Sequence, residues 1–150
     1  EGTVFRASAD KDELLNECLF EARRMEQATE QVRALPVEGE LRERLVAAAE
    51  IMQSHIARAG AVAAALGRRL PTAPEGEGDA AFTAARDALA ALMEPERDRL
   101  NHPPETVAVL LIGLLFERTV GPAAVLELPV HDLVSVVLHG ALTPDERNDR

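Results

Sequence analysis

The chain has little aromatic surface and almost no sulfur chemistry. Its 150 residues include no Trp, no Tyr, four Phe and one cysteine, Cys18. A single thiol excludes an internal disulfide, so we interpret Cys18 as a buried apolar residue, with a redox sensor as the alternative. With so few aromatic side chains the core must be aliphatic, which favours helices over a β-sheet. We therefore predict an all-α fold of five to six helices.

Long apolar segments and positive charge are also scarce. No apolar run approaches the roughly 20 residues of a membrane-spanning helix, and no signal peptide is recognisable, so we predict a cytoplasmic protein without a membrane partner. The net charge is −10, and Lys11 is the only lysine. Because affinity for DNA comes largely from neutralising phosphates, this chain by itself is expected to be repelled by DNA. An apolar fraction of 47% excludes a disordered chain.

Apolar residues that recur at three- and four-residue steps predict the helices, and proline and glycine predict their ends. Pro36 ends the first helix, Gly60 indicates a close helix contact or a kink in the second, and Pro95 predicts a kinked or separate last turn in the third. Residues 68–79, rich in proline, glycine and acids, form the clearest predicted loop. The predicted helices cover residues 11–34, 40–67, 80–100, 105–118 and 130–140.

The most hydrophobic stretch is VAVLLIGLLF, from Val107 to Phe116. Ten consecutive apolar residues on one helix cannot all face one core. Together with the apolar last helix, this predicts a homodimer in which two helices from each subunit form a four-helix bundle. The predicted interface residues are Val107, Leu111, Leu114, Arg118, Leu133, Val136 and Val137.

A cluster near the start of the chain has the chemistry of a phosphate clamp. Thr3, Phe5, Arg6 and Lys11 place a hydroxyl, an aromatic edge and two cations within nine residues. Asp10 follows as a helix N-cap. The alternative is a solvated junction between two helices without a DNA role.

Two stretches, Gly-Thr-Val-Phe-Arg (2–6) and Asp-Lys-Asp-Glu-Leu-Leu (10–15), resemble a junction found in the tetracycline-repressor (TetR) family of transcriptional regulators. In that family the junction links the DNA-binding domain, called the reader below, to the ligand-sensing domain. In that family the pattern is roughly Gly-Thr-hydrophobic-Tyr/Phe-basic-x-Phe-x-Ser/Asp-Lys-x-x-Leu. Ser8 departs from it, standing where the family usually has Phe, a residue that helps to close the DNA-binding core. The last two predicted helices also resemble those of the family.

This resemblance implies a domain division and a function. Residues 1–9 would end a helix-turn-helix DNA-binding domain whose other helices precede Glu1, and residues 10–150 would form the ligand-binding and dimerisation domain. Thr3, Phe5, Arg6 and Lys11 would contact operator DNA. The implied protein is a repressor that a small, largely apolar effector releases from its operator. The alternative is a helical ligand-carrier or protein-interaction domain without a DNA role.

Side chains on the central helices predict where such an effector would bind. His55 lies beside an apolar stripe and is either a core histidine or a polar anchor in the ligand cavity. The predicted pocket residues are Met52, His55, Ile56, Phe82, Arg86, Leu89, Met93 and Phe116. No nucleophile stands at a recognisable spacing from a base, and the four histidines form no metal-ligand pattern, so no enzyme, metal or cofactor is predicted.

Overall fold

The computed structural model describes residues 25–65, 77–121 and 127–141, and every regular element in these ranges is helical. This confirms the all-α prediction. Residues 25–33 are helical and come before the numbered elements. The elements that follow are α2 (Leu41–Ala65), α3 (Glu77–Met93), the 3-10 helix η1 (Glu94–Arg99), α4 (Pro104–Val120) and α5 (Val130–Ala141).

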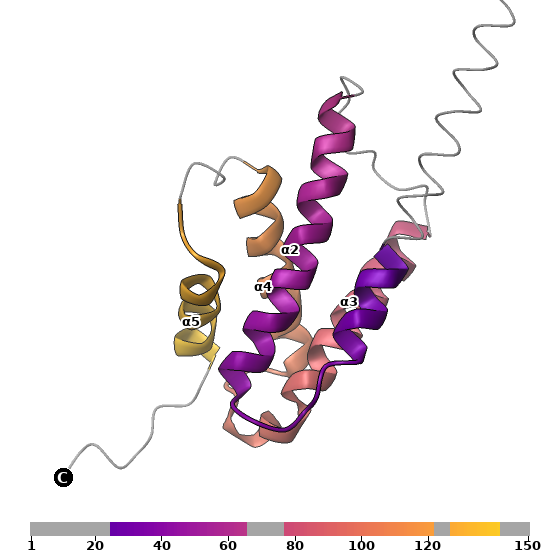
Figure 1. The fold of residues 1–150 in the computed structure, drawn as a ribbon. Helices are drawn as coiled ribbons and strands as arrows, with labels where there is room; N and C mark the ends of the chain where they lie inside the picture. The colour runs from indigo at the N-terminus through magenta and orange to yellow at the C-terminus, as the bar shows by residue number, and fades with distance from the viewer. Residues whose placement is uncertain (1–24, 66–76, 122–126, 142–150) are drawn as a thin grey trace, which may run out of the picture.

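The longest described helix, α2, is the centre of the bundle. It contacts α3, α4 and α5, while α4 also contacts α3 and α5. Figure 1 shows α5 on one side of α2 and the segment that starts at residue 25 on the other. The interior is aliphatic, as the composition predicts, because five large side chains from α2, α3 and α4 have no exposed surface. These are Leu45, Leu89, Met93, Leu111 and Leu115.

Proline and glycine end the helices where the sequence predicts. The 25–33 helix stops before Pro36, and Gly39 then adopts φ +92°, a conformation that L side chains rarely take. Pro95 separates η1 from α3, as predicted. Pro104 lies in the first turn of α4, where its missing N–H leaves no hydrogen bond unmade. Gly121 caps the other end of α4 with its N–H directed at the Glu117 carbonyl.

Several predicted boundaries differ from the structure, including those of α4, which covers Pro104–Val120 rather than residues 105–118. The third predicted helix begins at Glu77 rather than at residue 80, so the end of the predicted loop is helical. Gly140 lies within the last turn of α5 rather than beyond it.

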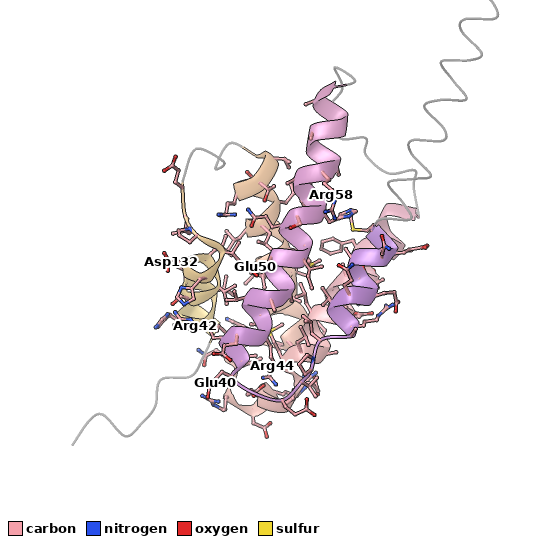
Figure 2. All side chains as sticks on the ribbon, viewed as in Figure 1. Glu40, Arg42, Arg44, Glu50, Arg58 and Asp132 are labelled. Atoms are coloured by element: carbon pink, nitrogen blue, oxygen red, sulfur yellow. The ribbon has the colours of Figure 1, made fainter. Side chains whose placement is uncertain are left out.

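A buried ion pair joins the base of α2 to η1. Arg44 is 5% exposed, and its guanidinium donates to the Glu96 carboxylate and to the Val37 carbonyl. Arg44 thereby extends from α2 towards η1 and the turn that precedes α2 (Figure 2). Its Nε has no hydrogen-bond partner, so the side chain depends on these two acceptors. One arginine therefore holds three segments together.

We expect Glu96→Ala to lower the free energy of unfolding by about 3 kcal/mol, because it leaves the Arg44 charge buried without its carboxylate partner. Chemical denaturation measures the loss. The double variant Arg44→Met/Glu96→Leu removes both charges and should lose much less.

The matched control is Glu94→Ala on the same 3-10 helix. Glu94 accepts from Arg97 at 2.7 and 2.9 Å, and this hydrogen bond lowers the pKa of the Glu94 carboxyl. Both partners are exposed to solvent, so the control should leave stability essentially unchanged. Equal losses for Glu94→Ala and Glu96→Ala would contradict a special role for the buried pair.

Gly60 marks a close contact between two helices, the first of its two predicted roles. A Cβ at Gly60 would lie 2.5 Å from Cγ1 of Val120, at the end of α4. Real Cβ atoms do not approach other atoms so closely, and Val is stiff at χ1. Glycine at this position therefore permits α2 and α4 to meet at Val120.

We expect Gly60→Ala to destabilise the wild-type bundle although alanine favours a helix by about 1 kcal/mol. In a Val120→Ala background the space is free, and the same change should become neutral or stabilising. A double-mutant cycle by chemical denaturation should give a coupling of about 1 kcal/mol or more. Additive effects would show that Gly60 and Val120 do not constrain each other.

Candidate functional site

The outward face of α4 is largely apolar, and no part of the chain that the structure describes covers it. Val109, Leu110, Leu114 and Phe116 are 40%, 54%, 44% and 44% exposed. Single exposed aliphatic side chains are normal on protein surfaces, but four on one helix form a patch that indicates an interaction site. We call these four side chains together with Gly113 the α4 face.

The opposite side of α4 faces the core of its own subunit. Val107, Ala108, Leu111 and Leu115 are fully buried. This arrangement follows from the ten-residue apolar run, because a helix that is apolar all round has one half for the core and one half left over. The apolar run from Val107 to Phe116 predicted that α4 is buried on more than one side. Among the described residues, only the side that faces the core is covered.

The neighbouring helix α5 buries most of its large apolar side chains and leaves one of them exposed. Leu133, Val134, Val137 and Leu138 contribute to the core, whereas Val136 is 64% exposed. Arg118 on α4 donates from Nε to the Leu128 carbonyl, just before α5 begins. This bond ties the start of α5 to α4.

The residues predicted for the dimer interface therefore lie in two different environments. Leu114 and Val136 are on the surface, and Arg118 is half-buried. The other four are covered inside the subunit: Val107, Leu111, Leu133 and Val137. Sequence periodicity could not separate the two halves of α4, because both halves are apolar. Val109 and Leu110, which the prediction left out, are among the exposed members.

The predicted pocket residues are also divided between core and surface. Met52, His55, Ile56, Leu89 and Met93 are buried at 8% exposure or less. The apolar members of this set belong to one continuous core with the side chains of α4. These side chains therefore fill the interior where the ligand was expected.

The remaining three predicted pocket residues face outward. Phe82 is 44% exposed, and Arg86 forms a surface ion pair with its neighbour Asp87 at 2.7 Å. Phe116, expected as a pocket wall, lies on the α4 face instead. Its position seven residues beyond Val109, close to two full turns, places it on the same outward side of the helix, because successive residues are rotated by about 100°.

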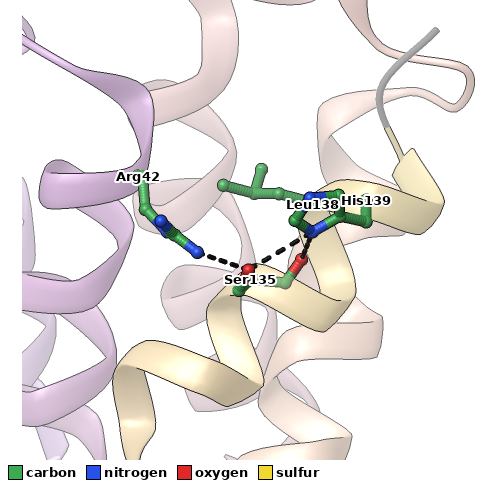
Figure 3. Close-up of a pocket in the computed structure, with 4 residues that line it drawn as sticks. All are labelled: Arg42, Ser135, Leu138 and His139. Carbon is green, nitrogen blue, oxygen red and sulfur yellow. Dashed lines mark hydrogen bonds between the residues drawn. The ribbon is translucent and has the colours of Figure 1, made fainter. Parts of the chain in front are cut away.

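A shallow hollow occurs elsewhere, between the start of α2 and the end of α5 (Figure 3). Arg42 donates to the Ser135 hydroxyl, and His139 Nδ1 lies 2.6 Å from the Ser135 carbonyl oxygen. Leu138 completes the lining. The hollow has a volume of about 180 Å³, which is below the roughly 300 Å³ of the smallest usual ligand pockets. The Arg42–Ser135 hydrogen bond joins α2 to α5, whereas the His139 contact lies within α5.

No metal centre or membrane segment is found in the described ranges. Within residues 25–65, 77–121 and 127–141, no three His, Cys, Asp or Glu side chains are close enough to share a metal ion. His131 contacts its neighbour Asp132 at 3.0 Å on the surface. Among the same residues no helix is long and apolar enough to cross a bilayer.

The predicted DNA-contacting residues lie outside the described part of the chain. These are Thr3, Phe5, Arg6 and Lys11, and Cys18 and Ser8 lie there too. The structure therefore describes the segment after the predicted reader, from residue 25 onward.

Comparison with known proteins identifies no relative. No protein-family model matches the chain, and neither the curated proteins nor the solved structures contain a match. Among the described residues, the exposed apolar side chains of the α4 face are the most prominent candidate for an interaction site.

Two adjacent leucines test the two halves of α4. Leu115 is fully buried and Leu114 is 44% exposed. We expect Leu115→Ala to lower the free energy of unfolding by about 3 kcal/mol through the cavity that it leaves in the core. Leu114→Ala should cost less than about 1 kcal/mol in dilute protein, because it leaves no internal cavity.

Chemical denaturation at several protein concentrations measures both effects. If the α4 face is covered in an oligomer, the cost of Leu114→Ala should rise with protein concentration, because association stabilises the folded state. A cost for Leu114→Ala equal to that of Leu115→Ala at all concentrations would contradict the assignment of the two faces.

Proposed function

We propose that this chain is the sensing and dimerisation part of a ligand-responsive transcriptional regulator that resembles the TetR family. The observation that carries the dimerisation part of the proposal is the apolar α4 face, which suits association of two subunits in an all-α bundle. The N-terminal motif supports the link to DNA, because Thr3, Phe5, Arg6 and Lys11 supply the groups that contact phosphates. In this proposal the regulator is a homodimer that represses transcription.

In the proposal, DNA binding and ligand sensing belong to different parts of the protein because their charges differ. A chain with a net charge of −10 gains no affinity for DNA by itself, so the positive charge must come from the reader. In the proposal the reader helices precede residue 1, and Arg6 and Lys11 belong to the edge of their contact surface. The acidic sensing domain then limits non-specific attraction to DNA.

The packed interior determines how an effector would act. Met52, Leu89 and Met93 are buried at 7%, 0% and 0% exposure, so a ligand between α2 and α3 must displace side chains. Methionine adapts to such a change because its side chain is unbranched and flexible. A ligand that binds only the opened arrangement shifts the population towards it, and the segment that leads to the reader would shift as well.

A second candidate is a helical domain that carries a ligand or binds a partner protein and has no DNA role. The α4 face favours it equally, since an apolar surface suits any helical partner. The acidic charge is also consistent with this candidate. DNA binding by the full-length protein distinguishes the two functions.

The decisive experiment measures DNA binding of the full-length protein to its own promoter region by fluorescence anisotropy, between 50 and 200 mM salt. We expect Arg6→Ala and Lys11→Ala each to weaken binding by about tenfold, and to reduce the salt slope by about one, because each removes one phosphate contact. The matched control is Arg58→Ala, which removes an exposed arginine from α2. It should bind like the wild type.

Failure of the full-length protein to bind its promoter at the lower salt concentration would overturn the regulator proposal. The second candidate, a ligand-carrier or protein-interaction domain, would then be the better supported function. Equal effects of Arg6→Ala and Arg58→Ala would show that general charge, rather than the N-terminal cluster, determines affinity.

A further inference from the structure

The hollow between the start of α2 and the end of α5 brings a cation, a hydroxyl and an imidazole together. It is lined by Arg42 from α2 and by Ser135, Leu138 and His139 from α5 (Figure 3). Arg42 and Ser135 are half-buried, Leu138 is buried and His139 is exposed. None of these lining residues carries a carboxylate, although the chain as a whole is acidic.

Arg42 has no carboxylate partner among the described residues. Its guanidinium donates to the Ser135 hydroxyl, which accepts a hydrogen bond but supplies no negative charge. Several other described arginines each form an ion pair with a carboxylate: Arg33, Arg44, Arg86 and Arg97. A guanidinium carries several N–H donors, so one hydroxyl leaves others for a ligand. A partly buried cation without a counter-ion favours an anion from solution.

The second ring nitrogen of His139 is also left for a ligand. His139 Nδ1 lies 2.6 Å from the Ser135 carbonyl oxygen and 3.2 Å from Ser135 Oγ. A carbonyl oxygen can only accept, so Nδ1 carries a proton and donates it. Nε2 has no hydrogen-bond partner among the described residues. The same tautomer argues against a nucleophilic serine, because the nitrogen beside the Ser135 hydroxyl already holds a proton and cannot act as its base.

We infer that this hollow binds a phosphate group, either inorganic phosphate or the terminal phosphate of a small molecule. Arginine binds phosphate through two N–H donors at once. A planar carboxylate is satisfied by that fork alone, whereas a tetrahedral phosphate has further oxygens outside the plane. Ser135 and His139, on the facing helix, are placed to contact them. The inference is independent of the proposed regulator function.

The size of the hollow suits an ion better than a larger organic molecule. Its volume is about 180 Å³, equal to the liquid volume of about six waters at roughly 30 Å³ each. A phosphate group, which is one phosphorus with its oxygens, fits within this volume. Because His139 is exposed, an organic group attached to the phosphate can extend into solvent.

The overall charge of −10 does not exclude a small anion from this position. At physiological salt the field of distant charges is screened within about 8 Å. The acidic residues nearest along the two helices, Glu40, Glu43 and Asp132, are exposed, so solvent weakens their effect. Arg42 is the second residue of α2, where the positive end of the helix dipole adds to its charge. The groups in the hollow therefore determine which ion binds.

Titration with inorganic phosphate, followed by NMR of the isotope-labelled protein at constant pH and ionic strength, tests the site. We expect saturable shifts at the amides of Arg42, Ser135 and His139. The midpoint should be on the order of 1 mM, as a few charge-assisted hydrogen bonds provide. Acetate should need about tenfold more, because a carboxylate uses only the guanidinium fork.

Two organic phosphates distinguish the sources of the phosphate group. Glycerol phosphate, a monoester, should bind within about threefold of inorganic phosphate. Dimethyl phosphate should bind at least about tenfold more weakly, because a diester carries a single charge and two substituents that the small hollow must accommodate. Equal binding of the two would overturn the assignment to a terminal phosphate, since DNA and lipid headgroups also offer diesters.

Variants of the lining residues locate the bound ion. Arg42→Gln should raise the midpoint by at least about tenfold, and Arg42→Lys, which keeps the charge but loses the fork, by about threefold. Ser135→Ala should also raise it by about threefold. The matched control is Arg58→Gln, an exposed arginine on the same helix, which should leave the midpoint unchanged. Unshifted amides in α3 and α4 show that each variant is folded.

The outcomes are independent of promoter binding. Shifts that grow equally with phosphate, acetate and chloride would show general screening and overturn the site. Equal losses for Arg42→Gln and Arg58→Gln would do the same, and the Arg42–Ser135 contact would then serve only to link α2 and α5. Neither result affects the regulator proposal, and a protein that does not bind its promoter leaves the phosphate site intact.

Discussion

The bundle depends on the charge pair at its base, which among the described residues is the one ion pair with a buried partner, Arg44. Arg44 extends from the start of α2 to Glu96 on η1 and to the Val37 carbonyl of the preceding turn. Because Arg44 is buried, its charge needs the Glu96 carboxylate in place: an unpaired charge costs far more free energy inside a protein than on its surface. The contact therefore determines where the turn at residues 34–40 and the 3-10 segment can lie. The aliphatic core above it has no comparable directionality, since hydrophobic burial is proportional to area.

The proposed function depends on the half of α4 that the core leaves exposed. The interior uses one half of α4, and the other half presents Val109, Leu110, Leu114 and Phe116 to solvent. The same helix thus contributes to the core and presents an exposed apolar surface, and in the proposed homodimer this would couple folding to association. If an effector opens the packed region near Met52 and Met93, the displaced side chains belong to a core continuous with α4. Ligand and partner would then influence each other through one set of contacts.

Much of the fold could be predicted from local chemistry. Pro36, Pro95 and the Pro103–Pro104 pair ended or began helices where expected, since proline restricts its own backbone and that of its neighbour. The start of α3 was misplaced because the proline- and glycine-rich composition before it was interpreted as a loop up to residue 79, whereas the helix begins at Glu77. The pocket was harder to predict. Leu89 and Met93 have the same spacing whether they line a cavity or fill a core, and only packing distinguishes the two.

The sequence by itself determined the helical class, the helix ends near proline and the excess of apolar surface on the last two helices. Each of these follows from residues that are close together in the chain. Only the tertiary structure decided which half of α4 is covered, because both halves are equally apolar and the choice depends on where α2, α3 and α5 pack. It also decided the role of Arg44, whose partner Glu96 lies 52 residues away. Long-range contacts of this kind leave no periodic signal in the sequence.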